Sequence, residues 1–352
     1  MENTRNAPSH NHYDVIVIGA GASGLYCALT AGRRGRRVLV LDHANKAGKK
    51  ILMSGGGRCN FTNYFVEPEH FIGSNAHFCK SALSRYPSWE FIGMVEQHKI
   101  PYHEREHGQL FCDECAAVGV QVRLNNQVDS VQALENDKKS RFQLSTTKAL
   151  SKKEKQERKD SGNQSKLPQT SYRCESLVVA TGGLSIPTLG ASGFGYELAQ
   201  QFGHTLVATD ASLVPFTFTD KTGELIRTLA GISLPVIASN ERISFKLPLL
   251  FTHRGLSGPA MLQLSNYWHL GETISINLLP DIDMTALFLA HKKSHPRQLI
   301  RTVLADNTDN ALPKKLLAAL QTHLWIDIKD TELANIKDER LIELGTTLNG
   351  WQ

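Results

Sequence analysis

A short run of β-branched residues, Val15–Ile18, passes directly into the segment Gly19–Gly24, which has the spacing G-x-G-x-x-G. Such a run suits a strand that is buried on both faces of a parallel sheet. Apolar residues then recur at helical spacing over residues 23–34, and Val38–Leu41 repeats the buried-strand pattern. The sequence therefore predicts a βαβ unit that begins at Tyr13.

The glycine pattern is weak alone, but between a buried strand and a helix it predicts a dinucleotide site. Gly19 permits the tight turn, Gly21 lets a pyrophosphate approach the backbone, and Gly24 lets the helix and the strand pack closely. The N-terminus of the helix would face the phosphates. The alternative interpretation is a glycine-rich turn that binds no ligand.

A carboxylate and a second glycine turn bear on which dinucleotide binds. Asp42 ends the second strand, where it can accept hydrogen bonds from both ribose hydroxyls and would repel a 2′-phosphate, so the site suits FAD or NAD better than NADP. Farther along the chain, the buried run Leu177–Ala180 ends in Thr181-Gly182-Gly183. That turn resembles the second, flavin-side fingerprint of two-dinucleotide-binding-domain flavoproteins, which favours FAD.

The composition excludes several classes of protein. With 352 residues, 41% of them hydrophobic and 21% charged, the chain is long enough for two or three globular domains. The net charge is +5, but Lys and Arg are scattered and the run at residues 152–159 is interrupted by acids, so the sequence does not favour a nucleic-acid partner. Six cysteines without a framework spacing, a polar N-terminus and no long apolar run predict a cytoplasmic protein with no membrane association.

We expect an α/β fold in which a Rossmann-type FAD-binding domain carries an inserted β-rich domain and a small helical part. Strand signals at Val120–Leu124, Val128–Leu134 and Phe142–Leu144 predict a β-meander, and the polar segment 151–171 is predicted to be a mobile loop. The expected divisions are residues 1–12 as a disordered tail, 13–195 as the FAD-binding domain with its meander, 196–283 as the inserted β-rich domain, 284–345 as the helical subdomain, and 346–352 as the start of a return to the FAD-binding domain.

Three separated segments together resemble one family: Gly48–Asn63, Ala180–Ser185 with Gly193–Tyr196, and Leu250–Ala260. They are similar to the YhiN-type (BaiN-like) FAD/NAD(P)-dependent oxidoreductases over about residues 13–350. The resemblance implies an FAD-dependent oxidoreductase in which NAD(P)H is a transient electron donor. Hydride would pass through flavin N5 to a small organic acceptor, which is unsaturated or cyclic in some members.

The segment Gly48–Asn63 supplies groups that suit a flat, anionic cofactor. Bare backbone N–H groups at Ser54–Gly57 can approach it, while Lys49, Lys50 and Arg58 can neutralise a diphosphate or a reduced flavin. The alternative interpretation is a polar loop under the sheet. The expected cofactor-binding residues are Gly19, Gly21, Ala22, Ser23, Gly24, Asp42, His43, Lys49, Lys50, Ser54, Gly55, Gly56, Gly57, Arg58, Cys59, Asn60, Thr62, Val128, Ala180, Thr181, Gly182 and Gly183.

The candidates for a catalytic role are His253, Arg254 and Cys59. The first two could act at the flavin or substrate cleft as an acid or an anion anchor, or they could belong to a structural turn that opens a helix at Pro259. Cys59 follows glycines as in the disulfide reductases, but Tyr64 occupies the position of the second cysteine in their C-x-x-x-x-C pair. Packing therefore explains Cys59 better than a redox disulfide does.

Two further patterns argue against additional sites. Gly190–Gly195 has the glycine spacing reversed and follows a Pro-containing turn, so no separate NAD(P) domain is expected and the donor would visit the flavin cleft. Cys112 and Cys115 form a C-x-x-C with no second Cys/His pair nearby, so no metal is expected.

The sequence departs from the family pattern in two places. Relatives usually have a helix between the counterpart of Gly108–Asp113 and the strand at Val120, and they continue past the counterpart of Leu348–Trp351 with a segment that contributes a third flavin contact. Here the first junction is short and the sequence stops at Gln352. One alternative is therefore an apo or non-catalytic flavin-fold protein. Another, an RNA-associated flavoenzyme, would require a clustered basic face.

Overall fold

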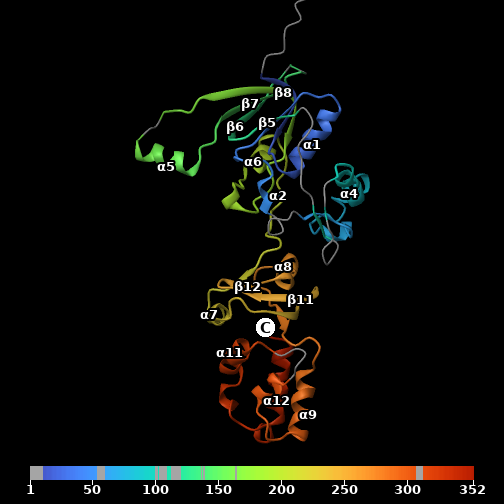
Figure 1. Cartoon of the computed structure of the whole chain (residues 1–352), viewed down its shortest axis with the longest axis vertical. Coiled ribbons are helices and arrows are strands. Elements are labelled where there is room, and N and C mark those ends of the chain that lie inside the picture. The colour runs from blue at the N-terminus through green and yellow to red at the C-terminus, as the bar shows by residue number, and fades with distance from the viewer. Residues whose placement is uncertain are drawn as a thin grey trace, which may run out of the picture. The chain divides into compact units, whose positions relative to one another are not determined.

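The computed structural model divides the chain into two compact units, Met1–Val207 and Ala208–Gln352 (Figure 1). The residues that the structure describes are 11–53, 60–99, 102, 109–111, 120–135, 137, 139–162, 165–306 and 312–352.

The first unit is built on a six-stranded sheet in the order β5-β2-β1-β8-β7-β6. β1 pairs in parallel with β2 on one side and with β8 on the other, and β5 extends the parallel part beyond β2. β7 and β6 add an antiparallel edge beyond β8. The strands are β1 (His12–Ile18), β2 (Val38–Leu41), β5 (Gln121–Arg123), β6 (Asn126–Ala133), β7 (Phe142–Lys148) and β8 (Gln169–Val179), and a separate pair is formed by β3 (Asn60–Asn63) and β4 (Gln109–Phe111).

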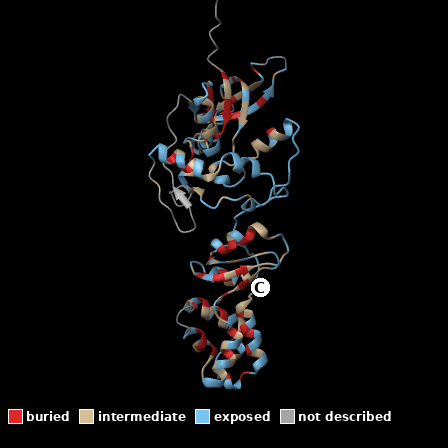
Figure 2. Cartoon of the chain, turned by 90° about the vertical axis from the view of Figure 1, so that its right-hand side faces the viewer, coloured by how far each residue is buried: buried red, intermediate tan, exposed pale blue. Residues whose placement is uncertain are grey.

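The buried β-branched runs place apolar residues on both faces of this sheet. Ile16 and Ile18 enter one hydrophobic cluster together with Leu39, whereas Val17 and Val40 enter a second cluster on the opposite face. This alternation is the two-residue period of a strand, and it needs apolar side chains at every position because both faces are covered. Figure 2 shows the resulting concentration of buried residues in the central strands.

Helix α1 (Ala22–Arg33) covers the face of the sheet that bears Val17. It begins after Gly21, whose extended backbone (φ −83°, ψ −175°) lies outside the helix, and its Gly24 and Ala28 are buried. The other helical elements of this unit are α2 (Lys49–Met53), η2 (Pro68–His70), α3 (Lys80–Arg85), α4 (Ser88–Gln97), α5 (Lys152–Asp160), η3 (Pro187–Leu189) and α6 (Phe194–Gln201).

The structure differs from the expected meander in its first strand. β5 pairs in parallel with β2 and extends the Rossmann part, so the antiparallel meander consists of β6, β7 and β8. The separation occurs at Asn125, whose positive φ of 55° turns the chain between β5 and β6. Parallel pairing across a distance of eighty residues leaves no local sequence pattern, which is why the strand was assigned to its nearest neighbours.

The segment predicted as a mobile loop, 151–171, contains helix α5 and the start of β8. A capping box explains the helix. Ser151 Oγ accepts a hydrogen bond from Glu154 N at 3.2 Å, and a Glu154 carboxylate oxygen accepts one from Ser151 N at 2.8 Å. In Figure 1, α5 lies at the far end of the excursion between β7 and β8.

The first unit also extends past the predicted boundary at residue 195. Helix α6 packs on the sheet through buried Leu198, and Gln201 Nε2 donates a hydrogen bond to Val131 O at 2.7 Å. Residues 1–10 of the expected tail lie outside the described residues, and β1 already includes His12.

The second unit combines an antiparallel sheet with a group of helices. The sheet has the order β13-β10-β11-β12-β9. Its strands are β9 (Phe216–Thr217), β10 (Ser233–Ser239), β11 (Ser244–Phe251), β12 (Gly255–Ser257) and β13 (Ser275–Asn277). The helical elements are α7 (Lys221–Thr228), α8 (Pro259–Leu264), η4 (Ser265–Tyr267), α9 (Met284–Ser294), α10 (Ile300–Ala305), α11 (Lys314–Leu324), η5 (Ile326–Ile328), η6 (Leu333–Asn335) and α12 (Asp338–Asn349).

The predicted β-rich and helical subdomains share one hydrophobic cluster, which runs from Ile226 to Leu348 and includes fully buried Trp325. Residues 346–349 complete α12, and Trp351 pairs with β13; the expected return of this segment to the first domain stays a prediction. Trp351 N donates to Ile276 O at 2.9 Å, and Ile276 N donates to Trp351 O at 2.8 Å. Trp351 therefore pairs with the backbone N–H and C=O groups of Ile276 at the edge of β13.

Two kinds of feature are absent from the described part of the chain. No helix there has the length and apolar character needed to cross a bilayer. No group of three or more His, Cys, Asp or Glu side chains there could hold a metal ion.

Candidate functional site

The glycine turn between β1 and α1 is packed too closely for any larger residue at two positions. Gly19 has a φ of +111°, and a Cβ there would lie 2.3 Å from Ala180 O. A Cβ at Gly24 would lie 1.9 Å from Gly19 O and 3.3 Å from Ala180 Cβ. The tight turn and the close helix packing predicted from the spacing are therefore both present, and the end of β8 closes against them.

Gly21 is different, because a Cβ built there meets nothing within 4 Å. It lies at the start of α1, whose first internal hydrogen bond runs from Leu25 N to Gly21 O at 3.0 Å. The N–H groups of Ala22 and Ser23 consequently have no partner within the helix. Open space beside bare N–H groups at a helix N-terminus suits a diphosphate, so the residues present fit the phosphate part of FAD.

Asp42 braces this turn with both carboxylate oxygens. Oδ2 accepts a hydrogen bond from Ala20 N at 2.6 Å, and Oδ1 accepts one from Ala44 N at 2.7 Å. The side chain keeps 14% of its surface exposed, and each oxygen has a second lone pair. The carboxylate thus fixes the turn while still offering acceptors to a ribose.

A cavity of about 50 Å³ lies beside Asp42, at the ends of β1 and β2. It brings together His43 and Val128, which the sequence placed at the site from distant positions. A Cβ at Gly190 would lie 2.3 Å from His43 Nε2, so the left-handed Gly190 (φ +89°) makes room for the imidazole. The lining residues are Ile18, Gly19, Leu41, Asp42, His43, Asn126, Gln127, Val128, Thr181, Gly190, Ser192 and Phe194.

Lys50 connects α2 to the glycine-containing turn that follows β8. From α2 its Nζ donates to Ser185 Oγ at 3.0 Å and to Gly183 O at 3.5 Å, and it would lie 3.7 Å from a Cβ at Gly182. The ammonium group therefore sits over the turn that follows β8. Ser185 was not among the predicted site residues, because a partner 135 positions away has no local signal.

The turn after β8 is also packed against the start of α6. A Cβ at Gly195 would lie 2.6 Å from Thr181 Oγ1, and one at Gly183 would lie 3.4 Å from the Tyr196 hydroxyl. The motif Gly193–Tyr196 thus holds Thr181–Gly183 in place. Lys49 lies on the same short helix, α2, as Lys50.

The structure gives no test of several other predicted residues. Ser54, Gly55, Gly56, Gly57, Arg58 and Cys59 lie outside the described residues, as do Cys112 and Cys115. Asn60 and Thr62 lie on β3, where Thr62 pairs with Leu110 of β4. Their contacts with a cofactor stay predictions.

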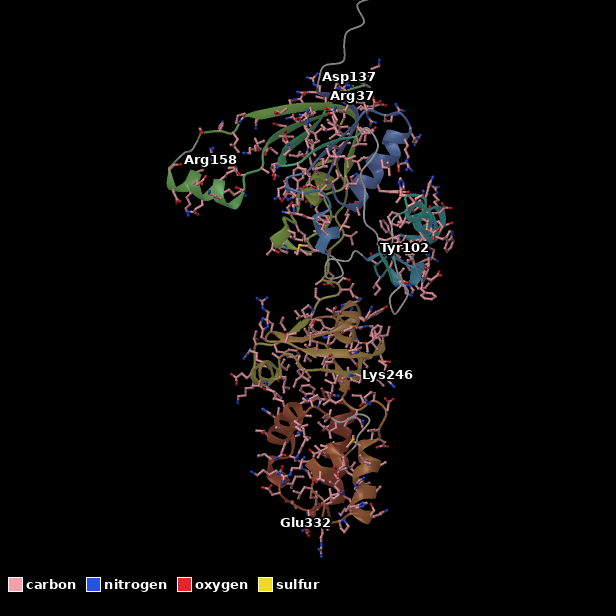
Figure 3. The ribbon with its side chains drawn as sticks, viewed as in Figure 1. Arg37, Tyr102, Asp137, Arg158, Lys246 and Glu332 are labelled. Carbon is pink, nitrogen blue, oxygen red and sulfur yellow. The ribbon has the colours of Figure 1, made fainter. Side chains whose placement is uncertain are left out.

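An aromatic cluster joins β3 and α4 to α1. Tyr26 of α1 lies 5.5 Å from Tyr86 and 5.9 Å from Phe91 between ring centroids, and Phe61 lies 5.5 Å from Phe91. Phe61 also lies 6.0 Å from Tyr102, which Figure 3 labels. Burial and the hydrogen bond shared with the Tyr26 hydroxyl raise the pKa of Tyr86, so its hydroxyl stays protonated. The cluster was missed in the sequence, where these rings have no common spacing.

His253 and Arg254 lie in the second unit, at the turn between β11 and β12. Thr252 Oγ1 accepts hydrogen bonds from Gly255 N at 3.1 Å and Arg254 N at 3.3 Å, and Thr252 N donates to Gly255 O at 2.8 Å. Both His253 and Arg254 are exposed, and α8 begins at Pro259 as expected. These bonds account for the turn, while the proposed role of the two side chains at a flavin stays a prediction.

The cysteines that the structure describes, Cys27, Cys79 and Cys174, are free. Burial raises the pKa of the Cys174 thiol to about 12, against a smaller opposing effect of a hydrogen bond from Ile16. A thiol that stays protonated at neutral pH is a poor nucleophile, so Cys174 has a packing role.

Comparisons with known proteins agree with this geometry. Residues 13–254 match the family model "HI0933-like protein Rossmann domain", and residues 210–352 match "HI0933-like protein barrel and H2TH domain". A relative from Escherichia coli named "Ribosomal RNA dihydrouridine synthase" is 44% identical over 97% of this chain and 80% of its own length. A "3-dehydro-bile acid delta(4,6)-reductase" from Clostridium scindens is 23% identical over 93% of this chain and 79% of its own length.

Among solved structures, a flavocytochrome c3 fumarate reductase in an open conformation matches 64% of this chain and 47% of its own, with 16% identity and a TM-score of 0.39. The predicted fold class, a Rossmann-type FAD-binding domain with a second domain, is confirmed by the family models. The family resemblance read from the three sequence motifs is confirmed with it.

Proposed function

The chain belongs to the HI0933-like family of flavoproteins, and on that premise we propose that it is an FAD-dependent reductase that converts uridine in ribosomal RNA to 5,6-dihydrouridine. NAD(P)H would be the electron donor. The balanced reaction is NAD(P)H plus a proton plus uridine, giving NAD(P)⁺ plus dihydrouridine. A hydride adds to one carbon of the C5=C6 bond, and a proton adds to the other.

The proposed substrate rests on the similarity to the relative from Escherichia coli. Its printed name states the activity, and 44% identity extends over 97% of this chain rather than over the nucleotide-binding motif alone. The acceptor fits the reductase chemistry, because the C5=C6 bond of uracil is conjugated to a carbonyl. This replaces the unspecified small organic acceptor expected from the sequence with a base in an RNA.

The residues at the glycine turn support FAD as the cofactor. The N–H groups of Ala22 and Ser23 would hold the diphosphate in the space beside Gly21, and Asp42 would hold a ribose. FAD, when bound, supplies a carrier that accepts a hydride from a nicotinamide and delivers it at N5. Lys50 would place a positive charge beside the ring, where it stabilises the anionic reduced state.

The proton must come from a protein group or from water. The candidates that this proposal keeps are His253 and Cys59. A His253→Gln variant that still accepts electrons from NAD(P)H but forms product slowly would identify the acid. We include Arg254 as the anion anchor for a phosphate of the bound RNA.

Purified protein provides the first test. We expect flavin absorbance bands that bleach anaerobically on addition of NADH or NADPH, and the more effective nucleotide identifies the donor. After incubation with unmodified ribosomal RNA transcript and the donor, nucleoside mass spectrometry should detect dihydrouridine at a gain of two hydrogens. Bleaching without this product would contradict the proposed substrate.

A second candidate function is reduction of a small unsaturated ketone. The 23% identical relative, whose name describes a bile acid reductase, spans 93% of this chain. Parallel assays with a steroid enone and with ribosomal RNA separate the two functions. Colourless protein whose melting temperature does not rise with FAD would instead support the apo alternative, because only a ligand of the folded state stabilises it.

A further inference from the structure

The end of α1 and the start of β2 carry a concentration of arginine. Four of the five residues from 33 to 37 are arginines. Arg37 has a structural role: its guanidinium lies 4.9 Å from the centroid of the Tyr13 ring, and its backbone N–H donates to Asp14 Oδ2 at 2.8 Å. Figure 3 labels Arg37 at this end of the sheet. The other three, Arg33, Arg34 and Arg36, are exposed.

A second segment brings one more cation, Lys99, to this end of α1. Arg33 Nη2 donates to His98 Nε2 at 3.2 Å, so the end of α4 adjoins the end of α1. Lys99 follows with a positive φ of 54°, and both His98 and Lys99 are exposed. We call Arg33, Arg34, Arg36, His98 and Lys99 the basic patch.

No carboxylate among the described residues forms an ion pair with the arginines or the lysine of the basic patch. Glu96, which is nearest in sequence, accepts a hydrogen bond from Tyr102 instead. Some exposed cations elsewhere in the described part of the chain do form ion pairs, as Lys246 does with Asp281. Clustered like charges oppose folding by mutual repulsion, so the patch needs another explanation.

The helix dipole explains only part of the patch. Arg33 and Arg34 lie at the C-terminus of α1, where a cation is favourable. Arg36 lies beyond the cap, and Lys99 lies past the last turn of α4. The remaining charge is free to meet an anion, and the guanidinium group suits phosphate because it can donate two parallel hydrogen bonds.

We propose that the basic patch binds the phosphate backbone of the ribosomal RNA substrate, a proposal that rests on the proposed function. The patch lies at the opposite end of α1 from the glycine turn. At about 1.5 Å per residue, α1 separates Arg33 from Ala22 by roughly 17 Å. An RNA held at the patch must therefore extend over several nucleotides to reach the cofactor, so the patch selects a polynucleotide over a free nucleoside.

The test compares two triple variants of the full-length protein. In R33Q/R34Q/R36Q the exposed arginines of the patch lose their charge, and in the control K153Q/K155Q/K159Q the same number of cations is removed from α5, where acids alternate with them. The side chains are exposed in both sets, so both variants should fold and keep the flavin content and NAD(P)H-dependent flavin reduction of the wild type. Binding to a ribosomal RNA transcript is measured by filter retention between 50 and 200 mM salt.

We expect wild type and control to share one slope of log affinity against log salt. The patch variant should bind more weakly, with a slope shallower by about 2 to 3. Each phosphate contact contributes about 0.7 to 0.9 to the slope, and three arginines lose their charge. Equal slopes for the patch variant and the control would overturn RNA binding at the basic patch. Dihydrouridine formation, and hence the proposed function, would remain intact. Wild type that neither binds the transcript nor forms dihydrouridine would overturn both. Preferential binding to phosphatidylserine vesicles, lost in the patch variant, would overturn RNA as the partner.

Discussion

Replacement of Gly24 by alanine tests the closest contact at the glycine turn. In an ordinary helix interior this change stabilises by about 1 kcal/mol. Here the new Cβ would lie 1.9 Å from Gly19 O, which is backbone and cannot rotate away. Overpacking costs about 1–3 kcal/mol, and the severity of this contact places it at about 3. The expected net loss is about 2 kcal/mol, or about 4–8 °C in the melting temperature of a unit this size.

Gly21→Ala is the matched control, because it adds the same methyl group three positions earlier, where nothing lies within 4 Å. Its backbone (φ −83°, ψ −175°) is open to alanine, so the apoprotein should keep its stability within about 1 kcal/mol. The methyl group would instead occupy the space that we assign to the diphosphate. A steric cost of about 1–3 kcal/mol on binding weakens FAD affinity about 5- to 150-fold.

Both variants are measured by thermal melting without cofactor and by titration with FAD. We expect Gly24→Ala to lower the melting temperature of the apoprotein and Gly21→Ala to lower FAD affinity alone. Melting of Gly24→Ala at the wild-type temperature would refute the close packing of α1 on the turn. Wild-type FAD affinity in Gly21→Ala would refute the placement of the diphosphate.

Three other outcomes are expected. Gly345→Ala should destabilise the second unit by about 1–2 kcal/mol and so lower its melting temperature, because a Cβ 2.6 Å from Thr285 N of α9 costs about 2–3 kcal/mol against a gain of about 1 kcal/mol for alanine within a helix. Lys50→Met should lower the flavin midpoint potential by about 30 mV in spectroelectrochemistry, the equivalent of about 1.4 kcal/mol for two electrons. Hydrogen bonds from Lys148 and then Ser151 lower the pKa of Glu154 from 4.5 to about 2, so the hydrogen-exchange protection of α5 should be complete above pH 4.5 and disappear as the pH falls towards 2.

The parts of the site that the sequence predicted depend on short stretches of backbone. Gly19 and Gly24 were assigned their roles correctly because a strand, a turn and a helix follow one another within a few residues, and that order fixes which glycine must lack a side chain. The capping box of Ser151 and Glu154 was equally local and could have been recognised, since a serine three residues before a glutamate at the start of a polar segment is an N-terminal helix signal.

Contacts between distant segments were not predictable in the same way. Lys50 was expected near the cofactor, but its hydrogen bond to Ser185 depends on where α2 and the turn after β8 meet. The pairing of β5 with β2 also depends on tertiary packing, because a three-residue strand has no pattern long enough to specify a partner. The basic patch combines both cases, since the arginines are adjacent in sequence whereas His98 joins them only through the packing of α4 against α1.

The backbone of the glycine turn is fixed by neighbours on three sides before any cofactor contributes. Gly19 N donates to Leu41 O at 2.8 Å, and Gly48 N donates to Ala20 O at 2.7 Å. Asp42 holds Ala20 N as well, and Ala180 packs against Gly19. A binding surface that is already ordered pays little conformational entropy when the ligand arrives. The effect of a methyl group at Gly21 on FAD affinity should therefore be steric, whereas a methyl group at Gly24 disturbs the order of the turn itself. For this reason we expect substitutions at two glycines three residues apart to be detected in different assays, FAD titration for Gly21 and thermal melting for Gly24.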